Sequence, residues 1–286
     1  MTFRDRVAVI TGAGSGIGAA LARELARGGA HVVASDLDET AAATTALAIR
    51  GLGRNATHAR LDVTNADAVE RLATETVSRH GRIDLWFNNA GIAVGGATED
   101  LELADWRRVL DVNLAGVVNG VHAVYPRMVR RGSGHIINIA SVAGLAPYPL
   151  ALPYVTSKRA VVGLSQALRA EARGHGVRVS VACPGMIMTP IWQRSEVRGA
   201  LADSREQLLA RVAPRMTAER CARTILRGVA ANRGVIPVTA EAHLAWYLER
   251  LSPALAVWVS ERIARHARSF ASPADRASSP TAAAQQ

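Results

Sequence analysis

Tyr154 and Lys158 are the residues whose types and spacing point most directly to chemistry. They stand four positions apart in the stretch PYVTSK, so on a helix both side chains lie on the same face. A free tyrosine has a pKa of about 10 and is therefore a weak base near neutral pH. Burial disfavours the phenolate further, whereas a nearby cation favours it. The spacing therefore predicts a tyrosine that exchanges a proton under the influence of the lysine.

Lys158 is the only lysine of the chain, and arginines make up the rest of its 34 basic side chains. A lysine ammonium is a compact point charge that carries protons and can hold hydroxyl groups, so a guanidinium replaces it poorly. We interpret the isolated lysine as a functional residue. For Tyr154 the alternative is a tyrosine at a subunit interface.

Residues 11–18, with the sequence TGAGSGIG, form a glycine-rich segment between an apolar run and an amphipathic one. Its pattern is set by Gly12, Gly16 and Gly18. Such glycines allow a tight turn and a close backbone approach to a pyrophosphate, and the following helix N-terminus favours an anion. An ordinary glycine-rich turn is the alternative. The position between a predicted strand and a predicted helix favours a dinucleotide-binding loop.

Asp36 ends the second apolar run. A carboxylate at this position accepts hydrogen bonds from the adenosine ribose hydroxyls of a bound dinucleotide. It would also repel a 2′-phosphate, and neither Ser15 nor Leu37 offers a basic side chain to hold one. The sequence therefore predicts NAD rather than NADP as the cofactor. An aspartate that only caps a turn or a helix is the alternative.

Seven apolar runs are predicted to be strands, at residues 6–12, 30–36, 56–63, 83–91, 134–141, 177–185 and 234–239. Helices are predicted between them at residues 17–29, 38–53, 65–81, 104–132 and 151–176, the fourth distorted near Pro126. Continuous apolar strands that alternate with helices indicate a parallel sheet covered on both faces. The predicted fold class is α/β, a single Rossmann-like doubly wound parallel sheet that forms one catalytic domain over residues 1–240.

Polar or glycine-rich residues follow three of these predicted strands. They are NNAG at residues 88–91, Ser141, and CPGMIMTP at residues 183–190. In doubly wound sheets, ligands bind at the carboxyl ends of the strands. We therefore expect these residues to meet at one edge of the sheet.

Charge and composition argue against several other classes of protein. The formal net charge is +10, but acidic residues are interleaved with the arginines, so no nucleic-acid partner is expected. No apolar run approaches the roughly 18–20 residues of a membrane-spanning helix, and the first residues do not resemble a signal peptide. Cys183 and Cys221 give neither a disulfide framework nor a metal spacing. A cytoplasmic protein without a metal site is expected.

The sequence resembles the short-chain dehydrogenase/reductase family. TGAGSGIG, Asp36, Asp62, NNAG, Asn113, Ser141, YVTSK and PGMIMT appear in that family's order and spacing, over about residues 5–240. The resemblance implies an NAD(P)-dependent oxidoreductase that interconverts an alcohol and its ketone by hydride transfer. NAD is the predicted cofactor, with NADP as the second choice.

The resemblance also implies roles for individual residues. Tyr154 would be the general acid/base and Lys158 would support it; Ser141 would donate a hydrogen bond to the substrate oxygen. Asn113 would hold a relay water through a local helix distortion, although a mid-helix residue that bonds its own backbone is the alternative. The implied cofactor-binding residues are Gly12, Ser15, Gly16, Ile17, Gly18, Asp36, Asp62, Val63, Asn89, Ala90, Gly91, Tyr154, Lys158, Pro184, Gly185 and Thr189.

In the same family the region at about residues 190–215 closes over the substrate. The candidate pocket wall here is apolar, which predicts a hydrophobic alcohol or ketone, and Arg194 is the one candidate for an arginine clamp. Side chains that merely pack the lid are the alternative. The candidate wall consists of Val94, Ser141, Leu145, Tyr148, Leu150, Met186, Met188, Ile191 and Trp192.

Residues 241–270 are predicted to form a helical C-terminal extension of two helices that meet near Pro253, and residues 271–286 a disordered tail. We expect the apolar stripe of the extension to pack on the same chain or across a subunit interface. Contact with an anionic membrane surface is the second hypothesis, because Trp258 and trailing arginines suit it. A homodimer or homotetramer is implied by the resemblance.

Two functions of other classes compete with the enzyme. One is a dinucleotide-binding regulator that has lost its chemistry, and the other is a membrane or assembly adaptor that uses the extension. The intact set of Asn113, Ser141, Tyr154 and Lys158 favours the enzyme, because a retired site has no physical need for the lysine.

Overall fold

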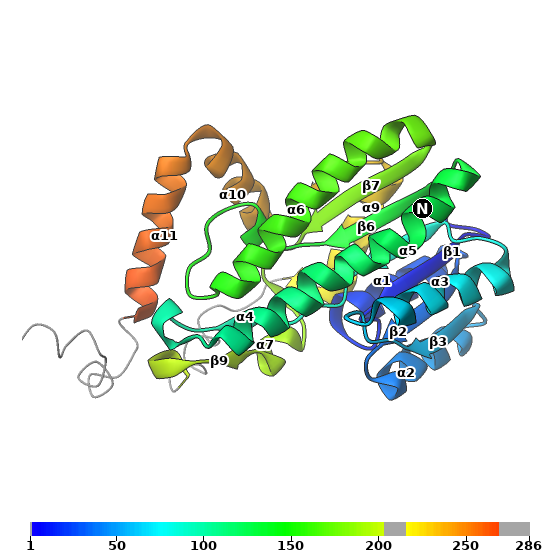
Figure 1. Ribbon diagram of the computed structural model, residues 1–286, viewed down its shortest axis with the longest axis horizontal. Coiled ribbons are helices and arrows are strands. Elements are labelled where there is room, and N and C mark those ends of the chain that lie inside the picture. The colour runs from blue at the N-terminus through cyan, green and yellow to red at the C-terminus, as the bar shows by residue number, and fades with distance from the viewer. Residues whose placement is uncertain (1, 203–215, 269–286) are drawn as a thin grey trace, which may run out of the picture.

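Seven short apolar segments pair into one sheet in the computed structural model, which describes residues 2–202 and 216–268 (Figure 1). The strand order is β11-β7-β6-β4-β1-β2-β3, and every neighbouring pair is parallel. The strands are β1 (Val7–Thr11), β2 (His31–Asp36), β3 (Ala56–Arg60), β4 (Leu85–Asn88), β6 (Gly134–Ile139), β7 (Val177–Cys183) and β11 (Val235–Pro237).

Helices cover both faces of the sheet because side chains alternate between two cores along each strand. On β1, Ala8 and Ile10 enter one core, while Val9 enters the other. The first core contains residues from α1 (Gly16–Arg27), α2 (Glu39–Arg50) and α9 (Ala218–Ala230). The second contains residues from α3 (Ala66–His80), α5 (Gly116–Arg131) and α6 (Leu152–Ala172).

This arrangement confirms the predicted α/β doubly wound fold. Strands β2 and β3 lie beyond β1 on one side, and β6, β7 and β11 lie beyond β4 on the other. The order of the strands therefore reverses between β1 and β4, which is the switch point at which such sheets bind ligands. Helix α9 is a finding beyond the sequence analysis, which did not identify it. It packs against α1 and places Ile225 and Leu226 in the core.

The long helix predicted at residues 104–132 is interrupted, but not at Pro126. It consists of α4 (Leu103–Leu110), one π-helical turn (Asp111–Ala115) and α5, and α5 continues through Pro126. The distortion therefore lies at the turn that contains Asn113. Single π-helical turns of this kind often occur at functional sites.

Two small ladders hold the segment that follows β7. In the first, β8 (Ile187–Met188) pairs with β10 (Met216–Thr217). In the second, β5 (Val94–Gly95) pairs with β9 (Glu196–Val197). The four-residue helix α7 (Ile191–Arg194) lies between β8 and β9. The predicted lid continues through residues 203–215, and the predicted tail covers residues 271–286; both of these ranges lie outside the described residues.

The C-terminal extension forms two helices, α10 (Ala240–Leu251) and α11 (Pro253–Arg268), which stand at one end of the molecule (Figure 1). One side of the extension faces the same chain. Ala242 and Ala256 are buried, the Ser260 hydroxyl donates to the Pro147 carbonyl at 3.0 Å, and Glu249 pairs with Arg159 at 2.9 Å.

The other side of the extension carries large apolar residues that this single chain leaves exposed. Leu244 and Leu251 on α10 are 70% and 83% exposed, and Trp258 on α11 is 47% exposed. Of the two placements expected first, packing on the same chain therefore does not account for these residues. A subunit interface and a membrane surface remain the two hypotheses for what covers them.

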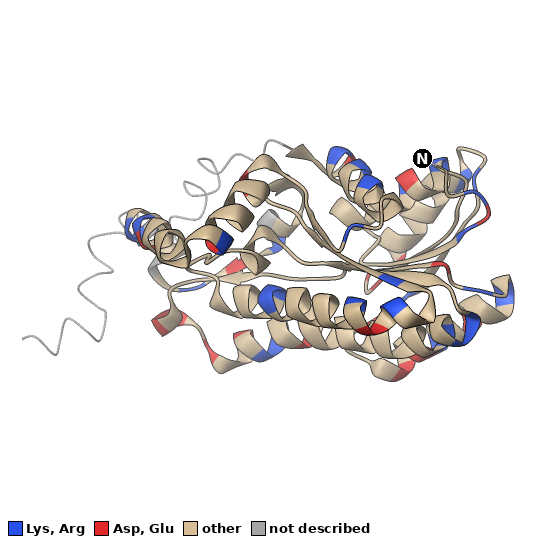
Figure 2. Cartoon of the chain, turned by 90° about the horizontal axis from the view of Figure 1, so that it is seen from above, with Lys and Arg blue, Asp and Glu red and all other residues tan. Residues whose placement is uncertain are grey.

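Charged residues of both signs are distributed over the helices on both sides of the sheet, as Figure 2 shows. This pattern agrees with the interpretation of the arginines as solvated helix faces. Among the helices that the structure describes, none has the length and apolar character needed to cross a bilayer.

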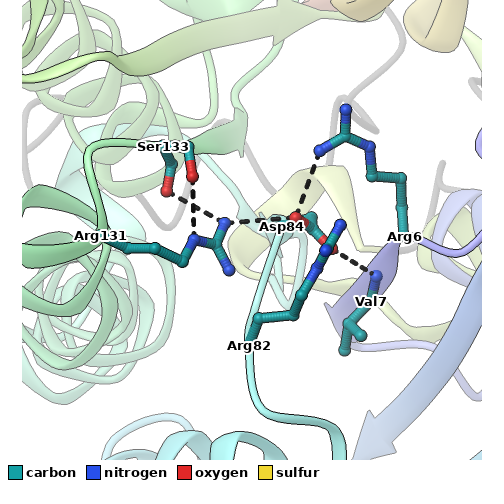
Figure 3. Close-up of polar contacts among 6 residues, drawn as sticks. All are labelled: Arg6, Val7, Arg82, Asp84, Arg131 and Ser133. Carbon is teal, nitrogen blue, oxygen red and sulfur yellow. Dashed lines mark hydrogen bonds and ion pairs between the residues drawn. The ribbon is translucent and has the colours of Figure 1, made fainter.

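Asp84 ties together the amino-terminal edge of the sheet (Figure 3). It immediately precedes β4, is 4% exposed, and accepts the backbone N–H of Val7 on β1 at 2.8 Å. Arg82, Arg131 and Arg6 contact the same carboxylate at 2.7, 3.2 and 3.3 Å. Burial alone would raise the pKa of Asp84, but the bonds from Arg82 and Val7 and the charges of Arg82 and Arg131 outweigh it and lower the pKa.

We expect Asp84→Ala to lower the free energy of unfolding by about 1–3 kcal/mol, because it removes a buried acceptor from Val7 and from the arginines. The stabilisation that the ionised Asp84 provides should be fully present above the pKa of this residue in the unfolded chain. It should be lost as the pH falls through the lower pKa that Asp84 has in the folded protein. Urea unfolding at pH 7 and in acid measures this. Glu75→Ala, on the exposed face of α3, is the control and should change stability by less than about 0.5 kcal/mol. Equal stability of Asp84→Ala and wild type at pH 7 would contradict the assignment.

Candidate active site

A cavity of about 580 Å³ opens at the carboxyl ends of the strands. It extends from the glycine-rich loop after β1, past the ends of β2, β4 and β6, to the residues around α7. This volume is in the range of cavities that hold small ligands and cofactors. The cavity therefore lies where the sheet topology predicts a binding site.

The loop from β1 to α1 comes too close to other backbone for larger side chains. Gly12 has φ +66°, and a Cβ on it would lie 2.8 Å from the Ala90 Cα. A Cβ on Gly18 would collide with the Gly12 carbonyl oxygen. Ser15 is the N-cap of α1 but makes no side-chain cap, and the first turn of α1 contains no acidic residue. The helix N-terminus thus presents its N–H groups and partial positive charge to the cavity without an internal anion.

Asp36 stands at the end of β2 and lines the same cavity. Its carboxylate accepts the Gly14 N–H at 2.8 Å and the Asp38 N–H at 3.1 Å. These two bonds hold the carboxylate beside the glycine-rich loop. Lys158 and Arg194 are the only basic residues among the described residues that line the cavity, and neither belongs to the loop after β2.

The two asparagines after β4 serve different purposes. Asn89 lines the cavity and donates through Nδ2 to the carbonyls of Thr11 and Gly12, at 2.8 and 3.1 Å. It therefore fixes the glycine-rich loop to the end of β4. Asn88 points into the protein, where it bonds Asn138 at 2.8 Å and belongs to a buried polar chain beneath the site.

Asn113 is fully buried in the π-helical turn and does not line the cavity. Its Oδ1 accepts the Ile92 N–H at 2.9 Å, and its Nδ2 donates to the Ile92 carbonyl at 2.9 Å and the Ser157 hydroxyl at 3.1 Å. The side chain therefore links the loop after β4 to α6, one residue before Lys158. It does not bond its own helix backbone in the way that the alternative interpretation supposed.

Tyr154 and Lys158 share one face of α6 and both line the cavity. The Lys158 Nζ lies 5.5 Å from the centre of the Tyr154 ring and donates to the Ile139 carbonyl at the end of β6, at 3.0 Å. Lys158 is only 4% exposed. Pro153 occupies the first turn of α6, where proline is tolerated.

Burial dominates the protonation of this pair. It raises the pKa of Tyr154 to about 12, although a hydrogen bond with Ser141 acts in the opposite direction. It lowers the pKa of Lys158 to about 8. In the protein alone, the lysine therefore does not outweigh burial, and Tyr154 remains a protonated phenol near neutral pH.

Ser141 completes the polar group at the end of β6. It is 8% exposed, it lines the cavity, and its hydroxyl accepts the Ala143 N–H at 3.2 Å. Cys183, at the end of β7, is a fully buried neighbour of this group. Burial raises the pKa of the Cys183 thiol to about 12, so the thiol stays neutral beside Ser141 and Lys158.

All of the residues predicted to bind the cofactor line this one cavity, and Ser141, Tyr148, Met186 and Ile191 from the predicted substrate pocket line it too. The other predicted pocket residues lie elsewhere or are not described. Leu145 packs into a core with Val117 and Val161, and Val94 is buried in the ladder with β9. Leu150 and Met188 are not among the lining residues, and the Trp192 side chain lies outside the described part of the chain.

Sequence analysis missed several lining residues, most of which adjoin a predicted one. Ile92 is the most informative, because its backbone is the partner of Asn113. Ser157, a partner of Asn113 that is not a lining residue, was also missed, although it stands inside the YVTSK motif. The missed lining residues are Leu37, Asp38, Leu61, Ile92, Ala93, Val112, Ile139, Ala140, Val142, Ala143, Ile187, Pro190 and Ser195.

Comparison with known proteins connects this geometry to a family. The model of the short chain dehydrogenase family matches residues 6–198. The putative oxidoreductase SadH of Mycobacterium tuberculosis is 37% identical over 257 residues, which cover 87% of this chain and 92% of SadH. The probable oxidoreductase EphD of the same organism is 38% identical over 88% of this chain, but the match spans only 44% of EphD. A cyclohexanol dehydrogenase of an Acinetobacter species is 39% identical over 66% of this chain and 76% of its own length.

Solved structures include similar proteins with either cofactor. A short-chain dehydrogenase/reductase from Burkholderia phymatum in complex with NAD has a TM-score of 0.82 and 33% identity, and covers 89% of this chain and 96% of its own. A metagenomic short-chain oxidoreductase in complex with NADP has a TM-score of 0.61 and 38% identity, and covers 64% of this chain and 83% of its own.

We expect the Lys158 amino group to titrate near pH 8, because burial disfavours its charge. The chain has one lysine, so lysine labelled with ¹³C at Cε gives a single NMR signal whose shift reports this titration directly. The same signal in the urea-unfolded chain is the control and should titrate near the model-compound value of about 10.4. A midpoint above about 10 in the folded protein would contradict the burial of the ammonium in this site.

Proposed function

The chain belongs to the short-chain dehydrogenase family, and from this premise we propose that it is an NAD-dependent oxidoreductase that interconverts a hydrophobic secondary alcohol and its ketone. The observation that carries the proposal is the position of Ser141, Tyr154 and Lys158 at one end of the cavity whose other end is the glycine-rich loop. The regulator without chemistry is less well supported, because it needs none of these three side chains.

The residues of the cavity fit a nicotinamide dinucleotide. Gly12 and Gly18 carry no side chain that would keep a ligand away from the backbone of the loop, and the first turn of α1 has no acidic residue to neutralise the helix N-terminus. Both features suit a pyrophosphate. Asp36 would hold the adenosine ribose, Asp62 and Val63 the adenine, and Thr189 the nicotinamide end. When bound, such a cofactor supplies the hydride acceptor for an alcohol or the hydride donor for a ketone.

Tyr154 is proposed to hold the proton that the reaction moves. With a pKa raised by burial, its phenol is ready to donate to the oxygen of a ketone. In the other direction it must accept the proton of an alcohol, which requires added positive charge to favour the phenolate. Lys158 supplies one such charge, and its three N–H groups can hold Ile139 and ribose hydroxyls together.

Ser141 and Asn113 are proposed to complete the set. Ser141 would donate its hydroxyl proton to the substrate oxygen, opposite Tyr154. Asn113 is a positioning residue in this structure, since its amide bonds Ile92 and Ser157 rather than the cavity. The relay water suggested by the family resemblance stays a prediction.

The substrate class is proposed from the lining of the cavity. Tyr148, Met186 and Ile191 present apolar surface to the same cavity as Ser141. The Acinetobacter relative is named a cyclohexanol dehydrogenase, and the 1-deoxy-11-beta-hydroxypentalenate dehydrogenase of Streptomyces exfoliatus is a second relative, at 39% identity over 71% of this chain. Both names denote dehydrogenases of alicyclic hydroxyl compounds, the second of which also carries a carboxylate, and both support an alcohol on an apolar carbon skeleton here.

We propose a homodimer or homotetramer in which the exposed leucines of α10 are covered by a second chain. The exposed Leu244 and Leu251 and the half-buried Leu248 recur at spacings of four and three, which is typical of a helix–helix contact. A monomeric mass in analytical ultracentrifugation would reject this proposal. The cytoplasmic location and the boundaries of the catalytic domain at 1–240 and the extension at 241–270 remain predictions.

Tyr154→Phe should lower the turnover of cyclohexanol with NAD by at least about 100-fold, because it removes the group that exchanges the proton. The dissociation constant for NAD should stay within about threefold of wild type. Steady-state absorbance of NADH and calorimetric titration measure the two quantities. Tyr247→Phe, on the exposed face of α10, is the matched control and should leave both unchanged. Turnover of Tyr154→Phe within about threefold of wild type would remove this residue from its proposed role.

The wild-type protein should prefer NAD to NADP, and Asp36→Ala combined with Leu37→Arg should shift the preference toward NADP. Each charge-assisted hydrogen bond that the substitutions add or remove is worth about 1.5–3 kcal/mol, or roughly tenfold to a hundredfold in affinity. The ratio of kcat/KM for the two cofactors measures the preference. Leu37→Arg alone separates the added charge from the lost carboxylate. A wild-type preference for NADP would show that Asp36 does not exclude the 2′-phosphate.

A further inference from the structure

We propose that Arg194 is a cofactor-binding residue that would contact the pyrophosphate of the dinucleotide together with the N-terminus of α1. The inference deepens the proposed function and rests on it. It differs from the role that the sequence suggested for Arg194, which was an arginine clamp in the substrate pocket.

The position of Arg194 carries the inference. Its Nη1 lies 3.5 Å from the Ser15 hydroxyl, although the two residues are far apart in the sequence. Ser15 is the N-cap of α1, so the guanidinium lies beside the N-terminus of that helix. Both residues line the cavity, together with Gly16. The guanidinium and the N–H groups of α1 thus border the same space from two elements.

The segment that carries Arg194 is held in place at both ends. The β8–β10 ladder precedes α7, and the β5–β9 ladder follows it. Thr189, just before α7, packs against Gly16, since a Cβ on Gly16 would lie 3.2 Å from the Thr189 side chain. The backbone N–H of Arg194 is bound to the Pro190 carbonyl at 2.9 Å. Arg194 therefore faces the glycine-rich loop because the chain around it is fixed there.

The charges nearby leave Arg194 available for an anion. Arg198, four residues later, pairs with Asp105 and Glu196 at 2.7 Å each, and Arg108 also pairs with Glu196. Among the residues that the structure describes, no carboxylate pairs with Arg194, and its one side-chain hydrogen bond is to the neutral Ser15 hydroxyl. The first turn of α1 has no acidic residue either.

Pyrophosphate is the anion that fits this place best. A guanidinium can bind phosphate oxygens through two parallel N–H groups, and a helix N-terminus binds the same oxygens through its backbone. The adenosine end of the cavity is occupied instead by the Asp36 carboxylate, which repels a further phosphate there. The guanidinium and the N-terminus of α1 meet at Ser15, which lines the same cavity.

The test is calorimetric titration of wild type, Arg194→Gln and Arg194→Lys with NAD, NADP, ADP-ribose and AMP, together with the KM of each protein for cyclohexanol. ADP-ribose retains the pyrophosphate and lacks nicotinamide, whereas AMP has a single phosphate. For Arg194→Gln we expect the dissociation constants of NAD and ADP-ribose to rise by roughly 5- to 30-fold, and that of AMP to rise less. Arg194→Lys should recover part of the loss. Arg54→Gln, which removes an exposed arginine outside the cavity, should change none of these dissociation constants.

Each other outcome overturns the proposal in a recognisable way. Unchanged affinity of Arg194→Gln for ADP-ribose, with a raised KM for cyclohexanol, would restore the substrate clamp. A loss confined to NADP would assign the guanidinium to a 2′-phosphate. Wild-type protein that binds neither NAD nor ADP-ribose would reject the proposed function along with this inference, whereas normal wild-type binding that Arg194→Gln leaves intact would reject only the role of Arg194.

Discussion

The buried ammonium of Lys158 is the constraint on which the rest of the site depends. A charge that is 4% exposed is unstable unless fixed acceptors surround it, and burial alone already lowers its pKa to about 8. The Ile139 carbonyl meets this need because β6 ends beside α6. The π-helical turn has a related effect, since it turns Asn113 toward Ile92 and Ser157 and so fixes the start of α6. The sheet edge, the helix and the irregular turn together hold one ammonium in place.

The glycine-rich loop is held just as firmly at the other end of the cavity. Asn89 bonds the carbonyls of Thr11 and Gly12, and Asp36 bonds the N–H of Gly14. Both contacts come from the ends of strands that flank β1, so the sheet determines where the loop lies. The glycine-rich wall of the cavity is therefore tied to the sheet where it would meet a pyrophosphate and a ribose. The segment after β7, which carries Arg194, is attached to the rest of the chain by two ladders of two residues each, one on either side of α7.

Sequence reasoning was accurate where the signal is local or strongly patterned. Seven apolar runs became seven parallel strands, and the spacing of Tyr154 and Lys158 placed both on one face of α6. It was wrong about the distortion at Pro126, because a proline in a long helix is a visible signal, whereas the π-helical turn at Asp111–Ala115 accompanies a contact of Asn113 with Ile92 that only the folded chain shows. Leu145 was misplaced for a similar reason. An apolar residue beside a predicted site can face the cavity or the core, and only packing decides which. The partner of Arg194 could not be predicted either, since it depends on how α7 is seated against the glycine-rich loop.

The position of the Asp84 cluster determines how substitutions at the two edges of the sheet combine. Asp84 and Asn89 stand at opposite ends of β4, about 16 Å apart at roughly 3.3 Å per residue. The two groups share no described partner, so the energetic effects of substitutions at the two edges should simply add. Stability at the amino-terminal edge of the sheet and the chemistry proposed for its carboxyl-terminal edge therefore depend on different residues of the same strands. Variation that strengthens one edge leaves the other free to acquire new specificity.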